Sequence, residues 1–312
     1  MSNAVVFPGQ GSQAVGMGRA LAEGFAEARH LFEEVDDALG QNLTRLMWEG
    51  PEDQLTLTEN AQPALMSVSL AVMRVLEKQG GWRLADKAAF VAGHSLGEYS
   101  ALAAAGTFTV ADAARLLKLR GQAMQKAVPV GVGAMAALLG VEMAEANAIA
   151  AEAAGDEICQ AANDNASGQV VISGHKTAID RAIALAAEKG FKRSVLLPVS
   201  APFHCKLMQP AADAMADALA KVTLAAPVVP LVANVTAAPS SDPEAIRRQL
   251  VEQVTGTVRW RESVLAMKDL GVDRLIEAGA GKVLAGLVKR IDKDISALSL
   301  QTPEDIDAFL SA

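Results

Sequence analysis

Short apolar runs alternate along this chain with longer stretches in which apolar residues return every three to four positions. The short runs predict strands, and the longer stretches predict helices with one buried face. An alternation of this kind is typical of a parallel sheet that is covered by helices. The predicted strands are Ala4–Phe7, Ala89–Gly93, Gln169–Ser173, Ser194–Leu197, Pro230–Ala233 and Asp273–Glu277.

The middle of the chain follows a different order. A predicted helix over 109–126 is followed by a break that contains one proline and two glycines. Beyond the break the pattern predicts a strand, a helix, two strands, a helix and a strand, which is the ferredoxin-like order. We therefore predict an α/β protein. Its expected domains are a large one over 1–128 and 198–312 and an inserted small ferredoxin-like one over 129–197.

Composition narrows the class of protein. The chain has 312 residues, of which 51% are hydrophobic and 21% charged, so it is long enough to bury a large core. Two cysteines, Cys159 and Cys205, are too few for a disulfide framework or a four-cysteine zinc site. The formal net charge of −8 argues against a nucleic-acid partner, because phosphate backbones attract basic surfaces.

The chain shows no pattern for export or membrane insertion. It begins without a basic segment and a long apolar run, so no signal peptide is expected. The longest uncharged stretch, 222–241, contains three prolines, so no transmembrane helix is expected. These features predict a cytoplasmic protein that has no membrane partner.

A candidate nucleophile follows the second predicted strand, in Gly93-His94-Ser95-Leu96-Gly97. Glycines two residues to either side of a serine allow a sharp strand-to-helix turn that exposes the hydroxyl. The following helix would offer the Leu96 N–H to a developing oxyanion. The alternative is an ordinary serine that caps a helix. Its place between a strand and a helix favours the nucleophile.

A serine nucleophile needs a base, and the chain has four histidines. His30 belongs to an acidic amphipathic helix and is expected on the surface. His94 is expected on the far side of the turn from Ser95, and His175, at a helix entrance, is expected to be exposed. His204 follows an apolar loop that contains proline, where a polar ring needs a partner. Both a catalytic base and a core histidine with a structural hydrogen bond fit that position.

Further motifs occur in a defined order: Phe7-Pro8-Gly9-Gln10-Gly11-Ser12-Gln13, Gly93-His94-Ser95-Leu96-Gly97-Glu98-Tyr99-Ser100-Ala101-Leu102, Arg120-Gly121 with Met124-Gln125, Pro202-x-His204-Cys205, Asn234-Val235 and Gly279-x-Gly281-Lys282-Val283-Leu284. In this order they resemble the malonyl-coenzyme A:acyl carrier protein transacylase family and, more broadly, the acyltransferase domains of polyketide synthases. The resemblance covers essentially the whole chain. It implies a hydrolase-like α/β domain with a small ferredoxin-like insert, which agrees with the predicted order of elements.

The resemblance also implies roles for six residues. Ser95 would be acylated with His204 as its base, Gln10 and Leu96 would donate backbone N–H groups to the oxyanion, Gln253 would help backbone carbonyls to hold the His204 ring, and Arg120 would bind the free carboxylate of the substrate.

The residues around Arg120 can be read without the resemblance. Leu116 and Met124 lie four positions to either side of it, so Arg120 rises from the edge of an apolar helix stripe. A planar guanidinium beside a nucleophile suits bidentate binding of a carboxylate. The alternatives are a structural salt bridge and a side chain that extends to water.

The resulting prediction is an enzyme that transfers a malonyl group from malonyl-CoA to the phosphopantetheine thiol of acyl carrier protein, through an ester on Ser95, and so feeds fatty-acid synthesis. This ping-pong reaction needs no metal and no organic cofactor. The alternatives are a serine hydrolase or thioesterase, a polyketide-type acyltransferase acting in trans, and a non-catalytic relative that binds the carrier. No histidine follows His204, which disfavours the hydrolase. By resemblance we expect a monomer.

Overall fold

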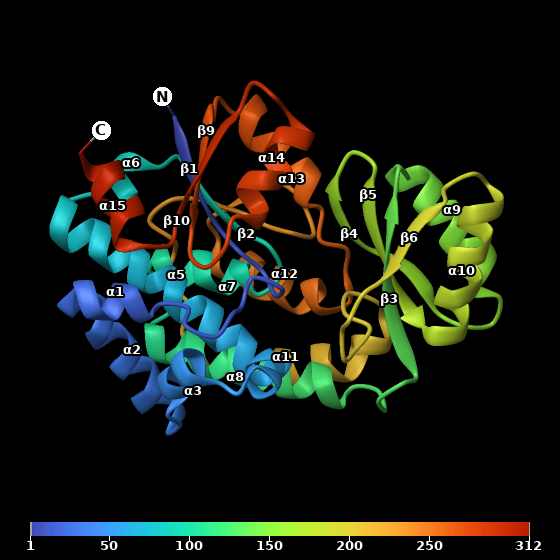
Figure 1. Ribbon diagram of the computed structural model, residues 1–312, viewed down its shortest axis with the longest axis horizontal. Coiled ribbons are helices and arrows are strands. Elements are labelled where there is room, and N and C mark those ends of the chain that lie inside the picture. The colour runs from blue at the N-terminus through green and yellow to red at the C-terminus, as the bar shows by residue number, and fades with distance from the viewer. Residues whose placement is uncertain (1, 312) are drawn as a thin grey trace.

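The central sheet of the protein is six-stranded and mostly parallel (Figure 1). The structure is a computed structural model that describes residues 2–311. The strands lie in the order β10-β9-β1-β2-β7-β8, and each neighbouring pair is parallel except β7 and β8. The predicted α/β core with a parallel sheet is therefore confirmed. The strands are β1 Asn3–Phe7, β2 Phe90–Gly93, β7 Leu231–Val232, β8 Pro239–Ser240, β9 Arg274–Ala278 and β10 Ser296–Leu300.

Strand β1 shows why short apolar runs form the centre of this sheet. Val5 and Phe7 pack into the core on one side of the sheet, whereas Ala4 and Val6 pack into the core on the other side. All four side chains are fully buried, so the run has no polar positions. The first core is shared with α2 Ala26–Leu39, α5 Thr58–Gly80, α7 Gly97–Ala104 and α8 Val110–Lys126, and the second with α13 Trp260–Asp269 and α14 Val283–Ile291.

Other helices surround these cores. Among residues 2–311, none of the helices combines the length and the apolar character that crossing a membrane would require. The surrounding helices are α1 Arg19–Gly24, α3 Leu43–Glu49, α4 Glu52–Thr56, α6 Leu84–Lys87, a 3₁₀ turn Lys206–Met208, α11 Gln209–Leu219, α12 Pro243–Thr255 and α15 Pro303–Leu310.

Strands β8 and β10 have no counterpart among the predicted strands, because each lies at a sheet edge and is only partly apolar.

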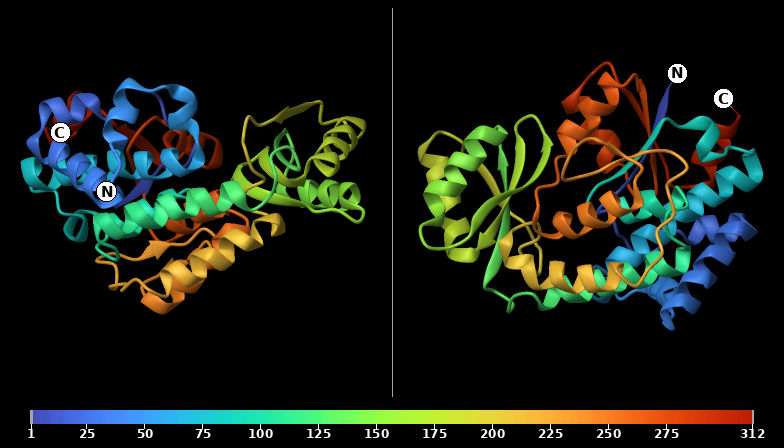
Figure 2. Two further views of the ribbon diagram at one scale, coloured as in Figure 1. Left: turned by 90° about the horizontal axis from the view of Figure 1, so that it is seen from below. Right: turned by 180° about the vertical axis from the view of Figure 1, so that it is seen from behind.

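A second, antiparallel sheet lies at one end of the molecule (Figure 2). Its strands are in the order β4-β5-β3-β6, and two helices pack on it around a separate apolar core. The chain passes through it as strand, helix, strand, strand, helix and strand, as predicted. The elements are β3 Gly133–Leu139, α9 Met143–Ala154, β4 Cys159–Ala166, β5 Gln169–His175, α10 Lys176–Glu188 and β6 Arg193–Leu196.

Strand β4 joins the second sheet to the segment before α13. Asp164 N donates to Val258 O at 2.9 Å, and Val258 N donates to Ala162 O at 2.8 Å. The Asp164 side chain is 1% exposed and forms an ion pair of 3.0 Å with Arg261 on α13. These contacts hold the end of β4 against the segment before α13, so the second sheet forms one wall of the cleft described below.

Candidate active site

Ser95 lies in the turn between β2 and α7, at the carboxyl end of a central strand. Its φ angle is 54°, in the left-handed region that residues other than glycine rarely adopt. Gly93 and Gly97, two residues to either side of Ser95, leave room for this turn. A Cβ on Gly93 would lie 1.9 Å from the carbonyl carbon of Gly97, and a Cβ on Gly97 would lie 2.3 Å from Phe7 O. The structure therefore has the strained serine turn that the glycine spacing predicts.

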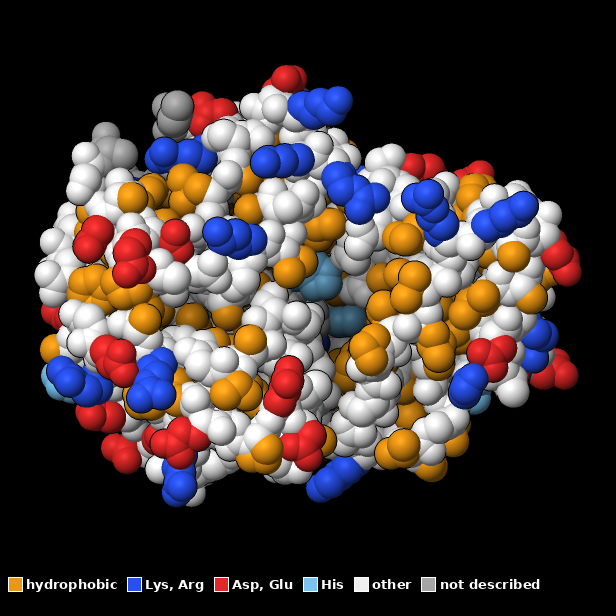
Figure 3. Space-filling model, viewed as in Figure 1, with side chains coloured by type: hydrophobic (Ala, Val, Ile, Leu, Met, Phe, Trp, Pro, Cys, Tyr) orange, Lys and Arg blue, Asp and Glu red, His pale blue; other side chains and the backbone are white. Residues whose placement is uncertain are grey.

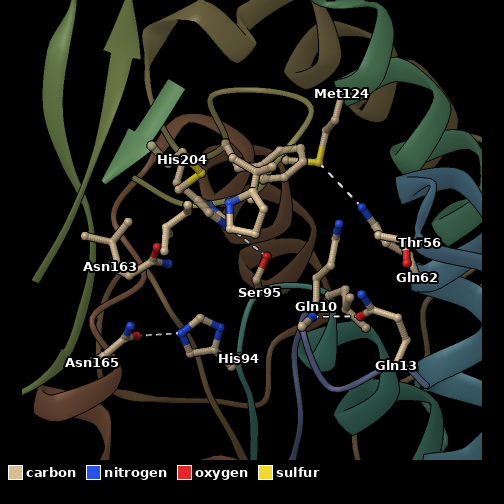
Figure 4. A pocket seen from close by; sticks show the side chains of 18 of the residues that line it. Gln10, Gln13, Thr56, Gln62, His94, Ser95, Met124, Asn163, Asn165 and His204 are labelled. Atoms are coloured by element: carbon tan, nitrogen blue, oxygen red, sulfur yellow. Dashed lines mark hydrogen bonds between the residues drawn. The ribbon is translucent and has the colours of Figure 1, made fainter. Parts of the chain in front are cut away.

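His204 reaches this serine from a segment 109 residues later in the chain. Its Nε2 lies 2.8 Å from Ser95 Oγ, as the dashed line in Figure 4 shows. Its Nδ1 lies 2.8 Å from the backbone oxygen of Gln253. Because a carbonyl oxygen can only accept, Nδ1 carries the proton and Nε2 is free to accept the serine hydroxyl. This is the hydrogen-bond arrangement that a general base requires.

The surroundings of His204 keep its ring neutral. The residue is 4% exposed, and burial is the largest of the causes that lower its pKa to about 3. The positive charge of Arg120 lowers the pKa further, while the hydrogen bond to the Gln253 backbone opposes both effects. A general base must be unprotonated, so these surroundings keep His204 ready to take a proton at neutral pH.

Arg120 lies on α8 and is 1% exposed. Its Nη1 donates to Gln62 Oε1 at 2.9 Å, and its Nη2 donates to Ser95 Oγ at 3.2 Å and to Gln253 Oε1 at 2.8 Å. Its Cζ lies 5.7 Å from the centre of the Tyr99 ring. These partners are uncharged and the side chain does not reach solvent. The guanidinium is therefore a positive charge directly beside the nucleophile, open to pairing with an anion.

Gln253 connects the three preceding residues. Its backbone oxygen contacts His204, its side-chain Oε1 accepts from Arg120, and its Nε2 donates to Ser95 O at 2.9 Å. The resemblance implied that Gln253 helps backbone carbonyls to hold the His204 ring. In the structure the carbonyl of Gln253 itself makes that contact, because α12 places its backbone against the ring and turns the side chain toward Arg120.

Two buried polar residues beside the site were not singled out by sequence analysis. Asn234 Oδ1 accepts from Ser95 N at 2.8 Å, and its Nδ2 donates to Gly93 O at 2.6 Å. Glu98 accepts from the side chain of Gln253 at 2.5 Å. Both residues occur within the motifs that carry the family resemblance. Nothing local in the sequence, however, shows which atoms they contact.

The two residues expected at the oxyanion site lie next to the serine turn. Leu96 is the residue before the first turn of α7. Gln10 follows Gly9, which packs so closely on the turn that a Cβ there would lie 2.8 Å from His94 O. Leu96 and Gln10 both line the same cavity as Ser95. Their role as backbone N–H donors to an oxyanion stays a prediction.

A cavity of about 520 Å³ joins these groups. Figure 3 shows it as a hollow between the two parts of the molecule, with histidine side chains at its bottom. Within the described chain, no cluster of histidine, cysteine or carboxylate side chains has the arrangement of a metal site. Besides the catalytic candidates, the residues that line the cavity include Gln13, Thr56, Gln62, Met124, Met135, Asn163, Asn165, Val171, Leu197, Pro198, Val199 and Phe203.

The expectation for His94 was wrong. Its ring lines the same cavity as the nucleophile, and its Nε2 lies 2.8 Å from Asn165 Oδ1 (Figure 4). The reason is tertiary, because β4 of the second sheet and Trp260, at 5.8 Å between ring centres, occupy the space around it. His175 is partly buried before α10 and accepts from a backbone N–H, while His30 is exposed as expected.

A strained serine at the end of a parallel strand, in contact with a histidine, is the arrangement typical of α/β enzymes that use a serine nucleophile. The protein family described as "Acyl transferase domain" matches residues 4–300 of this chain. The chain belongs to this family and is an acyltransferase.

Named relatives agree with this assignment. The chain is 47% identical over 307 residues to the malonyl CoA-acyl carrier protein transacylase of Escherichia coli (strain K12), with 98% of each chain covered. It is 57% identical to an acyl-carrier-protein-S-malonyltransferase from Bartonella henselae, with a TM-score of 0.97 over 100% of this chain and 99% of that one. It is 42% identical, with a TM-score of 0.96 over 100% and 99%, to a malonyl-transacylase solved with a type II polyketide acyl-carrier protein. The resemblance stated from the motifs is confirmed.

Proposed function

We propose that this chain transfers a malonyl group from malonyl-CoA to the phosphopantetheine thiol of acyl carrier protein and so feeds fatty-acid synthesis. The names of the relatives above support this substrate and this acceptor. The observation that carries the proposal is that one serine oxygen lies 2.8 Å from His204 Nε2 and 3.2 Å from Arg120 Nη2. A nucleophile, a base and a binding group for a carboxylate therefore meet at one atom.

The first half-reaction forms an ester on Ser95. His204 Nε2 takes the proton of the Ser95 hydroxyl as Oγ attacks the thioester carbonyl of malonyl-CoA. Backbone N–H groups of Leu96 and Gln10 stabilise the oxyanion. When this intermediate collapses, the C–S bond breaks, and the leaving thiolate of coenzyme A takes the proton from His204. The product is malonyl-Ser95 with a neutral histidine.

Arg120 selects the malonyl group. The distal carboxylate of malonate would pair with a guanidinium whose present partners are uncharged. An acetyl group has no such carboxylate, so it leaves the buried guanidinium with only uncharged hydrogen-bond partners. A missing ionic partner in a buried site costs more than a missing methylene group, so the selection against acetyl-CoA is strong.

The second half-reaction returns the site to its starting state. The thiol of the carrier's phosphopantetheine gives its proton to His204 and attacks the ester carbonyl. The Ser95 Oγ leaves and takes the proton back. No metal or organic cofactor takes part in either half.

We infer that the two sheets correspond to two domains. Residues 1–128 and 198–312 form the large catalytic domain, and residues 129–197 form a ferredoxin-like subdomain. The strand order β4-β5-β3-β6 and the separate apolar core of the second sheet support this division.

We also infer a cytoplasmic monomer. Both cysteines are free and buried, which fits a reducing compartment.

Mass spectrometry of the intact protein tests the function. Brief exposure to malonyl-CoA should add one malonyl group to the wild-type chain, and acyl carrier protein should remove it. Release of free malonate at the same rate without a carrier would support a hydrolase instead. The absence of both adduct and turnover would support a chain that only binds the carrier.

A further inference from the structure

Glu98 is a buried acid beside the proposed active site for which the reaction steps above give no task. It is fully buried in the first turn of α7, three residues after Ser95. Its Oε2 accepts from Gln253 Nε2 at 2.5 Å and from Asn234 N at 3.4 Å, while its Oε1 has no hydrogen-bond partner among residues 2–311. Burial of a carboxylate is costly unless its charge is paired and its oxygens are hydrogen-bonded.

The contacts of Glu98 distinguish the two ends of the Gln253 carboxamide. The amide nitrogen faces three acceptors, which are the Glu98 carboxylate at 2.5 Å, the backbone oxygen of Ser95 at 2.9 Å and Asn234 Oδ1 at 3.4 Å. The amide oxygen faces the guanidinium of Arg120, which can only donate. A reversed carboxamide would point N–H groups at Arg120 and an oxygen at a carboxylate. In its ionised form Glu98 opposes reversal more strongly than a neutral acceptor would, and the backbone oxygen of Ser95 opposes reversal in either form.

We propose that Glu98 is a positioning residue for the carboxylate-binding site and acts through Gln253. Glu98 holds the Gln253 carboxamide in the orientation that turns the amide oxygen to Arg120. The guanidinium of Arg120 is thereby fixed in place for the malonyl carboxylate. This inference rests on the proposed function, because it assumes that Arg120 binds the substrate's carboxylate. It assigns to Glu98 an effect on substrate selection that a purely structural buried acid would not have.

The charges around Glu98 are consistent with this role. Burial is the main cause that raises the pKa of Glu98 to about 7. The hydrogen bonds from Gln253 and Asn234 and the positive charge of Arg120 oppose the rise and favour the ionised form. With a pKa of about 7, Glu98 is partly ionised at neutral pH, and in that form its oxygens can only accept hydrogen bonds.

A second route from Glu98 leads to the nucleophile rather than to Arg120. Glu98 also contacts Asn234 N, and the side chain of Asn234 holds Ser95 N. If Glu98 acted mainly through Asn234, its loss would impair attack on every thioester. If it acts through Gln253 and Arg120, its loss impairs only the substrate that carries a carboxylate. The ratio of malonyl to acetyl transfer therefore separates the two routes.

The test compares Glu98→Met, which keeps the length of the side chain but removes the acceptor, with Glu98→Gln, which keeps one. The matched control is Glu277→Met, because Glu277 is also fully buried but binds the start of α14, outside the cavity lining. The measurements are kcat/KM for acylation by malonyl-CoA and by acetyl-CoA, together with the melting temperature.

Glu98→Met removes one charge-assisted contact from the series Glu98, Gln253 and Arg120. We expect it to lower kcat/KM for malonyl-CoA by about tenfold or more, and kcat/KM for acetyl-CoA by less than about threefold. Glu98→Gln should stay within about threefold of wild type for malonyl-CoA, because two donors hold its oxygen in place. Glu277→Met should leave the ratio unchanged. Equal losses for both substrates in Glu98→Met, or no loss for either, would overturn the proposal.

A further variant covers the case in which Glu98→Met does not fold. Gln253→Met removes the carboxamide and keeps the backbone oxygen that contacts His204. It also removes the contact of Nε2 with Ser95 O, so both substrates should lose rate, and the loss for malonyl-CoA should be clearly the larger of the two. Equal losses in this variant would also overturn the proposal. Failure of the wild-type chain to take up a malonyl group would instead remove the proposed function, and the two failures are thus distinguishable.

Discussion

The two sheets of this protein bury different kinds of interior. The core of the antiparallel sheet consists of small and aliphatic side chains, with one cysteine. At the carboxyl ends of the parallel strands the protein instead buries Arg120, His204, Glu98, Gln253 and Asn234, all less than 5% exposed. The first interior favours stability at little electrostatic cost. The second holds charges and strained backbone beside a cavity, which is where functional sites concentrate such costs.

The second sheet still takes part in the cavity. Asn163 and Asn165 on β4 and Met135 on β3 line it, and Asn165 contacts His94 of the serine turn. The contribution of this sheet is a wall of neutral side chains, whereas the groups that we propose to move protons or pair with charges come from the parallel-sheet part. We therefore expect substitutions at the site in the parallel-sheet part to lower activity, and substitutions in the core of the second sheet to lower stability.

The largest effect is expected at Ser95. Ser95→Ala should abolish the malonyl adduct in a mass spectrum, because the adduct needs the serine oxygen. The melting temperature should change little, since alanine is small enough for the turn. An adduct that persists in this variant would place the nucleophile elsewhere.

His204→Ala should follow in size. Removal of a general base typically lowers the rate by about a hundredfold or more. Stopped-flow or quenched-flow measurement of acylation by malonyl-CoA gives this rate directly. A loss below about threefold would contradict the assignment of His204 as the base.

Arg120→Ala should change selectivity more than overall rate. Malonyl transfer should fall by about a hundredfold, because the carboxylate loses a buried charge-assisted partner. Acetyl transfer should fall little or rise. The check is kcat/KM for both thioesters, and equal losses would show that Arg120 acts as a structural element.

The same variant should shift the pH dependence. Burial and the charge of Arg120 lower the pKa of His204, and the base works only when neutral, so activity is lost as the pH falls through that pKa. Removing the positive charge makes the protonated ring less unfavourable and raises the pKa. The acid limb of acetyl transfer in Arg120→Ala should therefore lie at higher pH than in the wild type. A limb that stays in place would show that the charge of Arg120 does not act on His204.

The smallest effect on chemistry is expected in the core of the second sheet. Ile172 on β5 is fully buried there, and Ile172→Ala should lower the free energy of unfolding by about 2–5 kcal/mol. Acylation per folded molecule should stay within about threefold of wild type. Denaturant titration and active-site counting check the two halves of this prediction. A large loss of acylation in the folded variant would mean that this core also orders the catalytic groups.

The sequence by itself determined the parts of this protein that depend on neighbours along the chain. The apolar runs predicted the central strands because each is buried on both faces, and the break after residue 126 marked the start of the second sheet. The glycine spacing around Ser95 predicted a turn that only glycines allow. The apolar neighbours of Arg120 placed it at the edge of an apolar helix stripe, which left burial and extension to water both open.

The tertiary structure alone decided which distant groups meet. Glu98 and the Gln253 side chain are 155 residues apart and Ser95 and His204 are 109 apart, and no local pattern specifies such pairs. The orientation of His94 was predicted wrongly because it depends on β4, which arrives from the other sheet. Local pattern encodes backbone conformation and burial. Hydrogen bonds between buried polar groups follow from how the whole chain packs, because a buried donor or acceptor must find its partner wherever the fold brings one.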